Sequence, residues 1–341
     1  MIFRKIIGIV VSGVLLVSGV STANSTPKKE TSEKYNAKGM YVIMTGDRMA
    51  SSSGEDGVAS VAVVIDGKVL QFDVGMKSME HLFKSGVSPT RINYVFFTHL
   101  HIDHIMGFPN YFFLRHIWGW EGGGEQEVKV FGPSGTKDMI QGSKDFMATH
   151  IRANPAFLKK CCGHEMPSIT DVLSEEITIG GVVLETDTFK VTATPVPHEV
   201  ESFAYRVDSK YGSVVISGDT APSLNVVDLA MNADLLIHEA TMREEGSSVS
   251  MIAKLEDGLR SETPSDKIGH TGPTELGKIA QKSKVKKLVA YHFGFALTHP
   301  DPKNIGEMDI VKNQFVSAIK KNYEGPLIMA VPLMVFEIGK D

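Results

Sequence analysis

Short apolar runs separated by turn residues dominate the chain from Gly39 onward. Val58–Ile65 and Val69–Val74 flank the dipeptide Asp66-Gly67, a pattern typical of a two-residue hairpin between paired strands. Met76–Ser85 follows with helical spacing of its apolar positions and stops before Gly86, as helices often do. This pattern predicts a hairpin followed by a helix.

The same reading predicts alternating strands and helices over the remaining chain. Strands are expected at Gly39–Met44, Ile92–Phe97, Val128–Phe131, Ile177–Ile179, Val182–Glu185, Phe189–Val196, Phe203–Asp208, Val214–Ser217, Asp234–Ile237 and Lys287–Tyr291, with two more at the end. Helices are expected at His104–Arg115, Thr136–Thr149, Leu224–Met231, Pro273–Ser283 and Ile305–Lys320, and an irregular insertion at Ile151–Asp171. Strands in runs with helices outside them predict an α/β sandwich of two sheets with helices on the outer faces.

The N-terminus has a different composition. Arg4 and Lys5 precede the uncharged run Ile6–Val20, and Ser21-Thr22-Ala23 provides small residues for a signal peptidase. A run of about 15 residues is shorter than the roughly 20 that a spanning helix needs, so a cleaved signal peptide is favoured over a retained anchor. We therefore expect a signal peptide at 1–23, a flexible leader at 24–38, one domain at 39–341, and a secreted or periplasmic location without a stable membrane anchor.

Net charge and cysteine content argue against two classes of protein, general nucleic-acid binders and disulfide-stabilised scaffolds. The formal net charge of −5 becomes −7 once Arg4 and Lys5 are removed, and a mildly acidic protein is a poor general binder of nucleic acid. The two cysteines, Cys161 and Cys162, are adjacent and form no disulfide framework. The two side chains could be free thiols or could form a labile vicinal disulfide, and the sequence leaves both alternatives open.

A dense cluster of ligand-type residues follows the predicted strand Ile92–Phe97. The segment Thr98–Gly107 reads THLHIDHIMG, with three histidines and one carboxylate within six positions. Imidazole and carboxylate are the ligand types that zinc prefers, and they also suit iron and manganese. On an extended backbone His99 and His101 point the same way, which favours one ion there and a second beside Asp103 and His104.

Four more polar residues occupy equivalent positions. Each directly follows a predicted apolar strand: His198, Asp219, His238 and His292. Strands that end in such residues place them at one edge of a sheet, where α/β proteins build their sites.

These motifs resemble the metallo-β-lactamase fold, and within it the branch that contains ribonuclease Z and the zinc-dependent arylsulfatases. The resemblance covers nearly all of Gly39–Ile338 and rests on THLHIDH, Pro197-His198, SGDT at Ser217–Thr220, HEAT at His238–Thr241, GHTGPTELG at Gly269–Gly277 and Tyr291-His292-Phe293. It implies a four-layer αββα sandwich and two divalent metal ions, most often Zn²⁺, with Fe or Mn as alternatives. It further implies the metal ligands His99, His101, His198, Asp103, His104 and His292, with Asp219 bridging.

The resemblance also assigns roles in hydrolysis by a metal-activated water. Asp103 would accept a proton from the water, and His238, oriented by Glu239, would donate one to the leaving group. A structural role for His238 is the alternative. His270 and Glu239 would line the substrate pocket, although His270 could instead cap the helix that starts at Pro273.

The segment between His198 and Asp219 bears on the choice of substrate. Ribonuclease Z grips tRNA with a long arm between the third ligand histidine and the bridging aspartate, and only 20 residues separate His198 from Asp219. With the predicted export and acidity, this favours an arylsulfatase-like hydrolase of small sulfate or phosphate esters, with nucleic acid an improbable partner and a homodimer left open. A ribonuclease Z-like phosphodiesterase, a lactonase and a non-enzymatic metal-binding protein are the alternatives.

Overall fold

The computed structural model describes residues 34–49, 57–118, 128–153, 172–241, 269–292 and 305–340. The predicted signal peptide, the leader up to residue 33, and the insertion residues 154–171 with both cysteines lie outside these ranges. Among the residues described, no helix combines the length and apolar character that a membrane span requires. The last leader residues belong to the folded domain, because Tyr35 is buried with its ring edge-to-face 5.4 Å from Tyr41.

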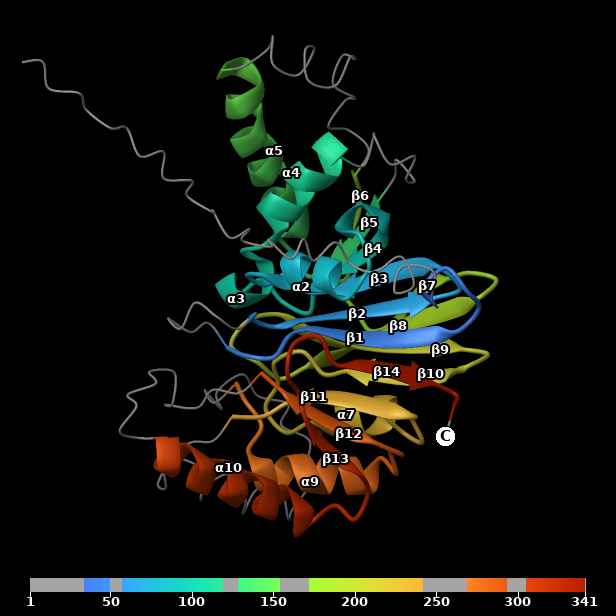
Figure 1. The fold of residues 1–341 in the computed structure, drawn as a ribbon, viewed down its shortest axis with the longest axis vertical. Coiled ribbons are helices and arrows are strands. Elements are labelled where there is room, and N and C mark those ends of the chain that lie inside the picture. The colour runs from blue at the N-terminus through green and yellow to red at the C-terminus, as the bar shows by residue number, and fades with distance from the viewer. Residues whose placement is uncertain are drawn as a thin grey trace, which may run out of the picture.

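Two seven-stranded sheets form the centre of the molecule (Figure 1). The first has the order β14-β1-β2-β3-β4-β5-β6, with bounds β1 Met40–Gly46, β2 Ser60–Ile65, β3 Lys68–Phe72, β4 Ile92–Phe96, β5 Val128–Gly132, β6 Val172–Glu176 and β14 Val335–Ile338. The second has the order β13-β12-β11-β10-β9-β8-β7, with β7 Gly181–Glu185, β8 Phe189–Val196, β9 Ser202–Ser209, β10 Gly212–Ile216, β11 Leu235–Glu239, β12 Leu288–Tyr291 and β13 Leu327–Met329. Neighbours from β3 to β6 and from β10 to β13 run parallel.

Helices cover the outer face of each sheet, which confirms the predicted αββα sandwich. On the first sheet lie α2 Ser78–Lys84, the 3₁₀ turn η1 Pro89–Arg91, α3 Ile102–Ile105, α4 Phe108–Trp118 and α5 Thr136–Ala153. On the second lie α7 Leu224–Leu229, α9 Pro273–Lys282 and α10 Ile305–Lys320. Three apolar clusters follow from this layering, one between the sheets and one beneath each helical layer.

The predicted helix His104–Arg115 is in fact two helices. α3 starts at Ile102, so Asp103 and His104 are helical rather than extended. The helix is interrupted at Gly107, and α4 begins at the next residue. A Cβ at Gly107 would lie 2.4 Å from the carbonyl oxygen of Gly75, so the close approach of these two segments requires glycine. The break lets α3 turn the ligand residues toward the sheet edge while α4 covers its outer face.

The predicted strand Ile177–Ile179 is also displaced. The strand lies upstream, at β6 Val172–Glu176, where the sequence VLSEE alternates poorly. β6 is an edge strand with Leu173 half exposed, so burial imposes little apolar pattern on it. Ile177 is buried for another reason, because it packs in the core between the sheets.

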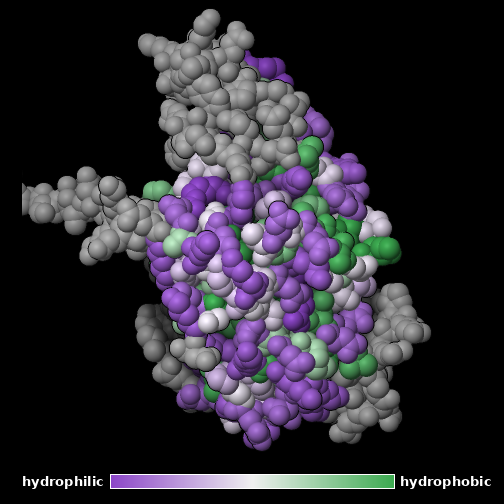
Figure 2. Space-filling model, turned by 90° about the vertical axis from the view of Figure 1, so that its right-hand side faces the viewer, coloured by the Kyte–Doolittle hydropathy of each residue, from purple (hydrophilic) through white to green (hydrophobic). Residues whose placement is uncertain are grey.

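Figure 2 shows a largely hydrophilic face, with hydrophobic residues in small groups between polar ones. Apolar side chains are exposed on and between the two edge strands β6 and β7, at Leu173, Ile179 and Val182. Such isolated exposure is ordinary for a folded surface.

Aromatic packing between the sheets dominates the central core. Phe96 stacks on Phe72 and on Phe131 with ring centroids 5.0 Å apart in each pair, and lies 5.5 Å from Tyr205 of the opposite sheet. We expect Phe96→Ala to lower the free energy of unfolding by about 3 to 5 kcal/mol, because the cavity would have rigid rings on three sides. Urea denaturation would measure this, with Phe146→Ala on the exposed face of α5 as the control. Equal losses in both variants would contradict the assignment of Phe96 to the core.

Candidate metal centre

The first sheet supplies four of the predicted ligands from one short segment. β4 delivers His99 just beyond its carboxyl end, His101 is the N-cap residue of α3, and α3 itself carries Asp103 and His104. His99 and His104 are fully buried, and Asp103 is nearly so. The amide of Val74 donates to the carbonyl of His104, which fixes α3 against the end of β3.

The second sheet supplies the other three ligands, each just beyond a strand. His198 follows β8, Asp219 follows β10, and His292 follows β12. His292 has a φ of 57°, a left-handed conformation that costs a non-glycine residue roughly 1 to 2 kcal/mol. Backbone strain of this kind clusters at functional sites, where surrounding contacts hold it in place.

The fold brings all seven side chains together in two groups. His99, His101 and His198, which we call the first ligand group, lie with Asp219 so that one ligand atom from each falls within 4.8 Å of the others. Asp103, His104 and His292, the second ligand group, meet the same limit. Within the first group Nε2 of His198 is 3.2 Å from Nδ1 of His101, and within the second Nε2 of His104 is 3.2 Å from Nε2 of His292.

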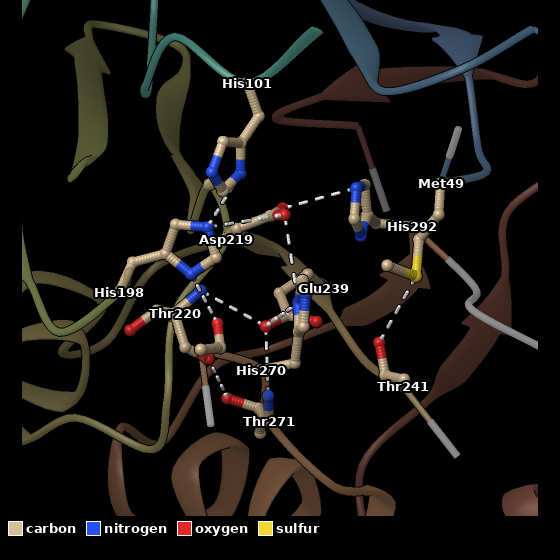
Figure 3. Close-up of polar contacts among 12 residues, drawn as sticks. Met49, His101, His198, Asp219, Thr220, Glu239, Thr241, His270, Thr271 and His292 are labelled. Atoms are coloured by element: carbon tan, nitrogen blue, oxygen red, sulfur yellow. Dashed lines mark hydrogen bonds and ion pairs between the residues drawn. The ribbon is translucent and has the colours of Figure 1, made fainter. Parts of the chain in front are cut away.

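Asp219 lies between the two groups, with one oxygen toward each. Its Oδ1 is 3.4 Å from Nε2 of both His104 and His292. Its Oδ2 is 3.8 Å from Nε2 of His99 and 4.0 Å from Nε2 of His198. This is the arrangement of a carboxylate that could bridge two cations, as Figure 3 shows for His198, Asp219 and His292.

The pKa shifts at the site favour an ionised Asp219 surrounded by mostly neutral histidines, a combination that suits a bound cation. Burial opposes ionisation of Asp219, but the imidazoles of His292 and His104 outweigh it and hold its pKa well below the usual range. Burial lowers the pKa of His99 and His198, so both rings are neutral and able to act as ligands. His104 is the exception: its burial is outweighed by Asp219 and Asp73, which raise its pKa well above normal.

Two buried polar atoms at the centre have no hydrogen-bond partner within the described structure. They are Nε2 of His99 and Oδ1 of Asp219, and both face the space between the ligand groups. Buried polar atoms are nearly always satisfied, so an unsatisfied pair of ligand atoms fits a bound cation. The donor set therefore suits two divalent ions, without distinguishing zinc from iron or manganese.

Asp73 is a residue of the site that the sequence reasoning did not identify. Its Oδ2 is 2.7 Å from Nδ1 of His104, and it also accepts hydrogen bonds from the amide and hydroxyl of Thr98. A carboxylate on the far nitrogen of a ligand histidine fixes its tautomer and orientation. In the structure Asp73 directly follows strand β3, as the other candidates follow their strands, whereas the predicted strand Val69–Val74 contained it.

The side chain of Glu239 contacts His270. Its Oε1 is 3.3 Å from Nδ1 of His270 and accepts the backbone amides of Thr220 and Thr271 (Figure 3). Burial raises the pKa of this carboxyl. His270 also lies 3.8 Å from Oδ2 of Asp219, so the Glu239–His270 pair borders the predicted metal centre.

The expected contact between Glu239 and His238 runs through the backbone of Glu239, because strand register places the two side chains on opposite faces. Strand β11 runs through Glu239, and Ile237 packs between the sheets while Leu236 and Ala240 pack under the helices. Because side chains alternate along a strand, Glu239 faces the site and His238 faces the helical layer. His238 is fully buried there, and its Nδ1 contacts the backbone oxygen of Glu239. Proton donation by His238 stays a prediction, which this geometry does not favour.

Fold and site together define a class of protein, a metal-dependent hydrolase of ester bonds with the metallo-β-lactamase fold. Residues 72–293, well over half of the chain, match the family model described as the β-lactamase superfamily domain. The chain belongs to this family.

Three known proteins illustrate the relationship. The ribonuclease Z of Methanothermobacter thermautotrophicus is 26% identical over 304 residues, which cover 74% of this chain and 86% of that protein. The metallo-β-lactamase fold protein YhfI from Bacillus subtilis superposes with a TM-score of 0.65 at 18% identity, covering 88% of this chain and all of that one. The short form of human tRNase Z superposes with a TM-score of 0.57 at 21% identity, covering 87% and 99%. The two superpositions support the fold alone.

The contact between Asp73 and His104 makes a testable prediction about metal binding. We expect Asp73→Asn to weaken binding of one divalent ion about 10- to 100-fold, because the neutral amide no longer holds the His104 ring as a ligand. Equilibrium dialysis with Zn²⁺ followed by metal analysis would measure it. Asp228→Asn on the exposed face of α7 is the matched control. Unchanged affinity in Asp73→Asn would argue against an orienting role.

The environment of His238 predicts how stability depends on pH. Burial lowers the pKa of His238 from 6.5 to about 4, so between these values the unfolded chain binds the proton and the folded chain does not. The contribution of His238 to the free energy of unfolding should thus be fully present above pH 6.5. It should fall by about 3 kcal/mol as the pH drops to 4. We expect His238→Gln to remove this part of the loss in metal-free protein, as urea denaturation from pH 4 to 8 would show. A pH dependence identical to that of the unsubstituted protein would contradict it.

Proposed function

We propose that this protein is a ribonuclease Z-like phosphodiesterase that uses two divalent metal ions. The observation that carries the proposal is the position of Asp219, whose two oxygens face two separate groups of ligand residues. Two ions held this way lower the pKa of a bound water and neutralise charge on phosphoryl oxygens. The ribonuclease Z relative, aligned over most of both chains, supports phosphodiester chemistry over the other ester classes.

The residues of the chain divide the remaining work. His99, His101 and His198 would hold one ion, Asp103, His104 and His292 the other, and Asp219 both. Asp103, 3.3 Å from Nε2 of His292, would accept the proton of the attacking water. His270 would donate a proton to the leaving oxygen, because Glu239 fixes its ring beside Asp219, whereas His238 faces away. General acid help of this kind contributes about 10²- to 10⁴-fold in rate.

A second candidate is hydrolysis of small aryl sulfate or phosphate esters. It is favoured by the segment between His198 and Asp219, which is fully used by the hairpin of β9 and β10 with its turn at Lys210-Tyr211. A large RNA would therefore need a contact surface elsewhere on the protein. Export of the mature protein, proposed from residues 1–23, also suits a small extracellular ester.

An activity panel tests the proposal. We expect the metal-loaded protein to hydrolyse bis(p-nitrophenyl) phosphate, to lose this activity on chelation, and to regain it with Zn²⁺ or Mn²⁺. His99→Ala should lower the rate by about 10³-fold, because the first ligand group loses a buried member and with it the several kcal/mol that a bound ion supplies. His150→Ala on α5, outside the site, is the control.

The same panel separates the two candidates. A precursor tRNA with a 3′ extension and an aryl sulfate would be tested beside the diester. Cleavage of the precursor would support the ribonuclease Z-like substrate. Hydrolysis of aryl sulfate without diester hydrolysis would replace the first proposal with the second, and a metal-loaded protein inactive on all three would overturn both.

A further inference from the structure

Four residues before α9, Gly269 to Gly272, contact both halves of the proposed machinery. The carbonyl oxygen of Gly269 is 2.7 Å from Nδ1 of His198, a member of the first ligand group. The next residue, His270, has its Nδ1 3.3 Å from Oε1 of Glu239. This segment, the 269–272 loop, thus contacts a predicted metal ligand through Gly269 and carries the proposed proton donor, His270, at the next position.

The contact with His198 determines which of its nitrogens can bind metal. A carbonyl oxygen only accepts hydrogen bonds, so Nδ1 of His198 must carry the hydrogen. Nε2 is then left with its lone pair, and this is the atom that lies 3.2 Å from Nδ1 of His101 and 4.0 Å from Oδ2 of Asp219. The loop therefore holds His198 in the tautomer that the first ligand group requires.

The loop packs on His198 without space to spare. A Cβ at Gly269 would lie 2.3 Å from Nδ1 and 2.7 Å from Cε1 of the imidazole, both on a ring that has no flexible end to move away. The backbone of the loop consequently cannot shift toward His198, and a shift away would lengthen the 2.7 Å hydrogen bond.

Thr271 anchors the loop from the other side. It is fully buried, and its amide donates to Oε1 of Glu239 at 2.9 Å. Its hydroxyl donates to the carbonyl of Thr220 at 2.8 Å (Figure 3). Its carbonyl accepts the amide of Thr241 at 2.9 Å. Thr220 is the neighbour of Asp219, so this one residue ties the loop to the bridging carboxylate and to Glu239.

We propose that the 269–272 loop couples binding of the metal at the first ligand group to the placement of His270, with Thr271 as the positioning residue. Loss of the Thr271 anchor frees Gly269 and His270 together, since they are adjacent in one loop. Metal affinity and proton donation then change as one event, and by linkage a metal bound at His198 also steadies His270. The statement about proton donation rests on the proposed function, whereas the statement about metal affinity does not.

Metal binding provides the first test. Thr271→Val keeps the shape of the side chain and removes the hydroxyl, and Thr271→Ser keeps the hydroxyl. Apoprotein of each variant would be titrated with Zn²⁺ against a competing chelator, with Co²⁺ absorption as a second readout. We expect Thr271→Val to bind one of its two ions about 10- to 100-fold more weakly, and Thr271→Ser to bind both as the unsubstituted protein does.

Two further variants control for general damage. Thr241→Val removes only a 3.8 Å contact between the hydroxyl and the sulfur of Met49, and it should bind both ions normally. Gly269→Ala pushes the loop off His198 without altering Thr271, and it should show the same weakened ion as Thr271→Val. Circular dichroism of each apoprotein identifies any variant that fails to fold. If either Thr271→Val or Gly269→Ala fails to fold, the other one provides the test.

The activity measurement compares two leaving groups. p-Nitrophenolate leaves without a proton, whereas the ribose oxygen of a dinucleotide needs one. With saturating metal, we expect Thr271→Val to lower kcat at least about 10-fold more for the dinucleotide than for bis(p-nitrophenyl) phosphate, which a purely structural defect would not do.

The outcomes separate the two claims. Two ions bound with normal affinity in both Thr271→Val and Gly269→Ala would overturn the coupling, whatever the activity. One ion weakened in these variants, in a protein that hydrolyses no phosphodiester, would support the coupling to the metal and contradict the proposed function alone.

Discussion

The buried carboxylate of Asp219 is the interaction on which the site depends. Removing a carboxylate from water costs several kcal/mol unless nearby charges and hydrogen bonds compensate. Here the compensation comes from His104 on the first sheet and His292 on the second, and His104 is itself held by Asp73. The series of contacts from Asp73 through His104 to Asp219 therefore crosses from one sheet to the other. The charge of Asp219 is compensated only when the two sheets are packed together.

This arrangement explains why the candidate ligands come from strand ends. The apolar core between the sheets leaves no room for ions, so polar residues gather where β4, β8, β10 and β12 end. The sequence showed this rule clearly: four predicted strands were each followed by a histidine or an aspartate. This rule and the histidine-rich segment after Phe97 indicated a site at one sheet edge, whereas the full set of seven ligand candidates came from the resemblance of the motifs to a known family. Asp73 obeys the same rule, because β3 ends at Phe72, but the apolar pattern extends the predicted strand through Val74 and so hides Asp73 inside it.

What could not be predicted depends on tertiary context. The break at Gly107 reflects the approach of Gly75, a contact invisible in a helical pattern. The displaced strand β6 lies at a sheet edge, where burial imposes little alternation. The roles of His238 and Glu239 turn on whether the strand ends at Ile237 or continues through Glu239. Only the continued strand places Glu239 toward the site, and the register with β12 shows that it continues, with Glu239 opposite Tyr291.

Charge balance at the centre bears on which ester can bind. Asp73, Asp103 and Asp219 crowd the site with negative charge, which in the absence of metal repels any anionic ester. Two divalent cations would bring four positive charges against these three carboxylates and so would reverse the balance. The loaded site then attracts a singly charged anion, a description that fits a phosphodiester and a sulfate ester equally well. Discrimination between them must come from the leaving-group side. His270 lies beside Glu239, and under the proposed role of His270 a leaving oxygen that needs a proton, as in a nucleic acid, would gain more from it than a phenolate would.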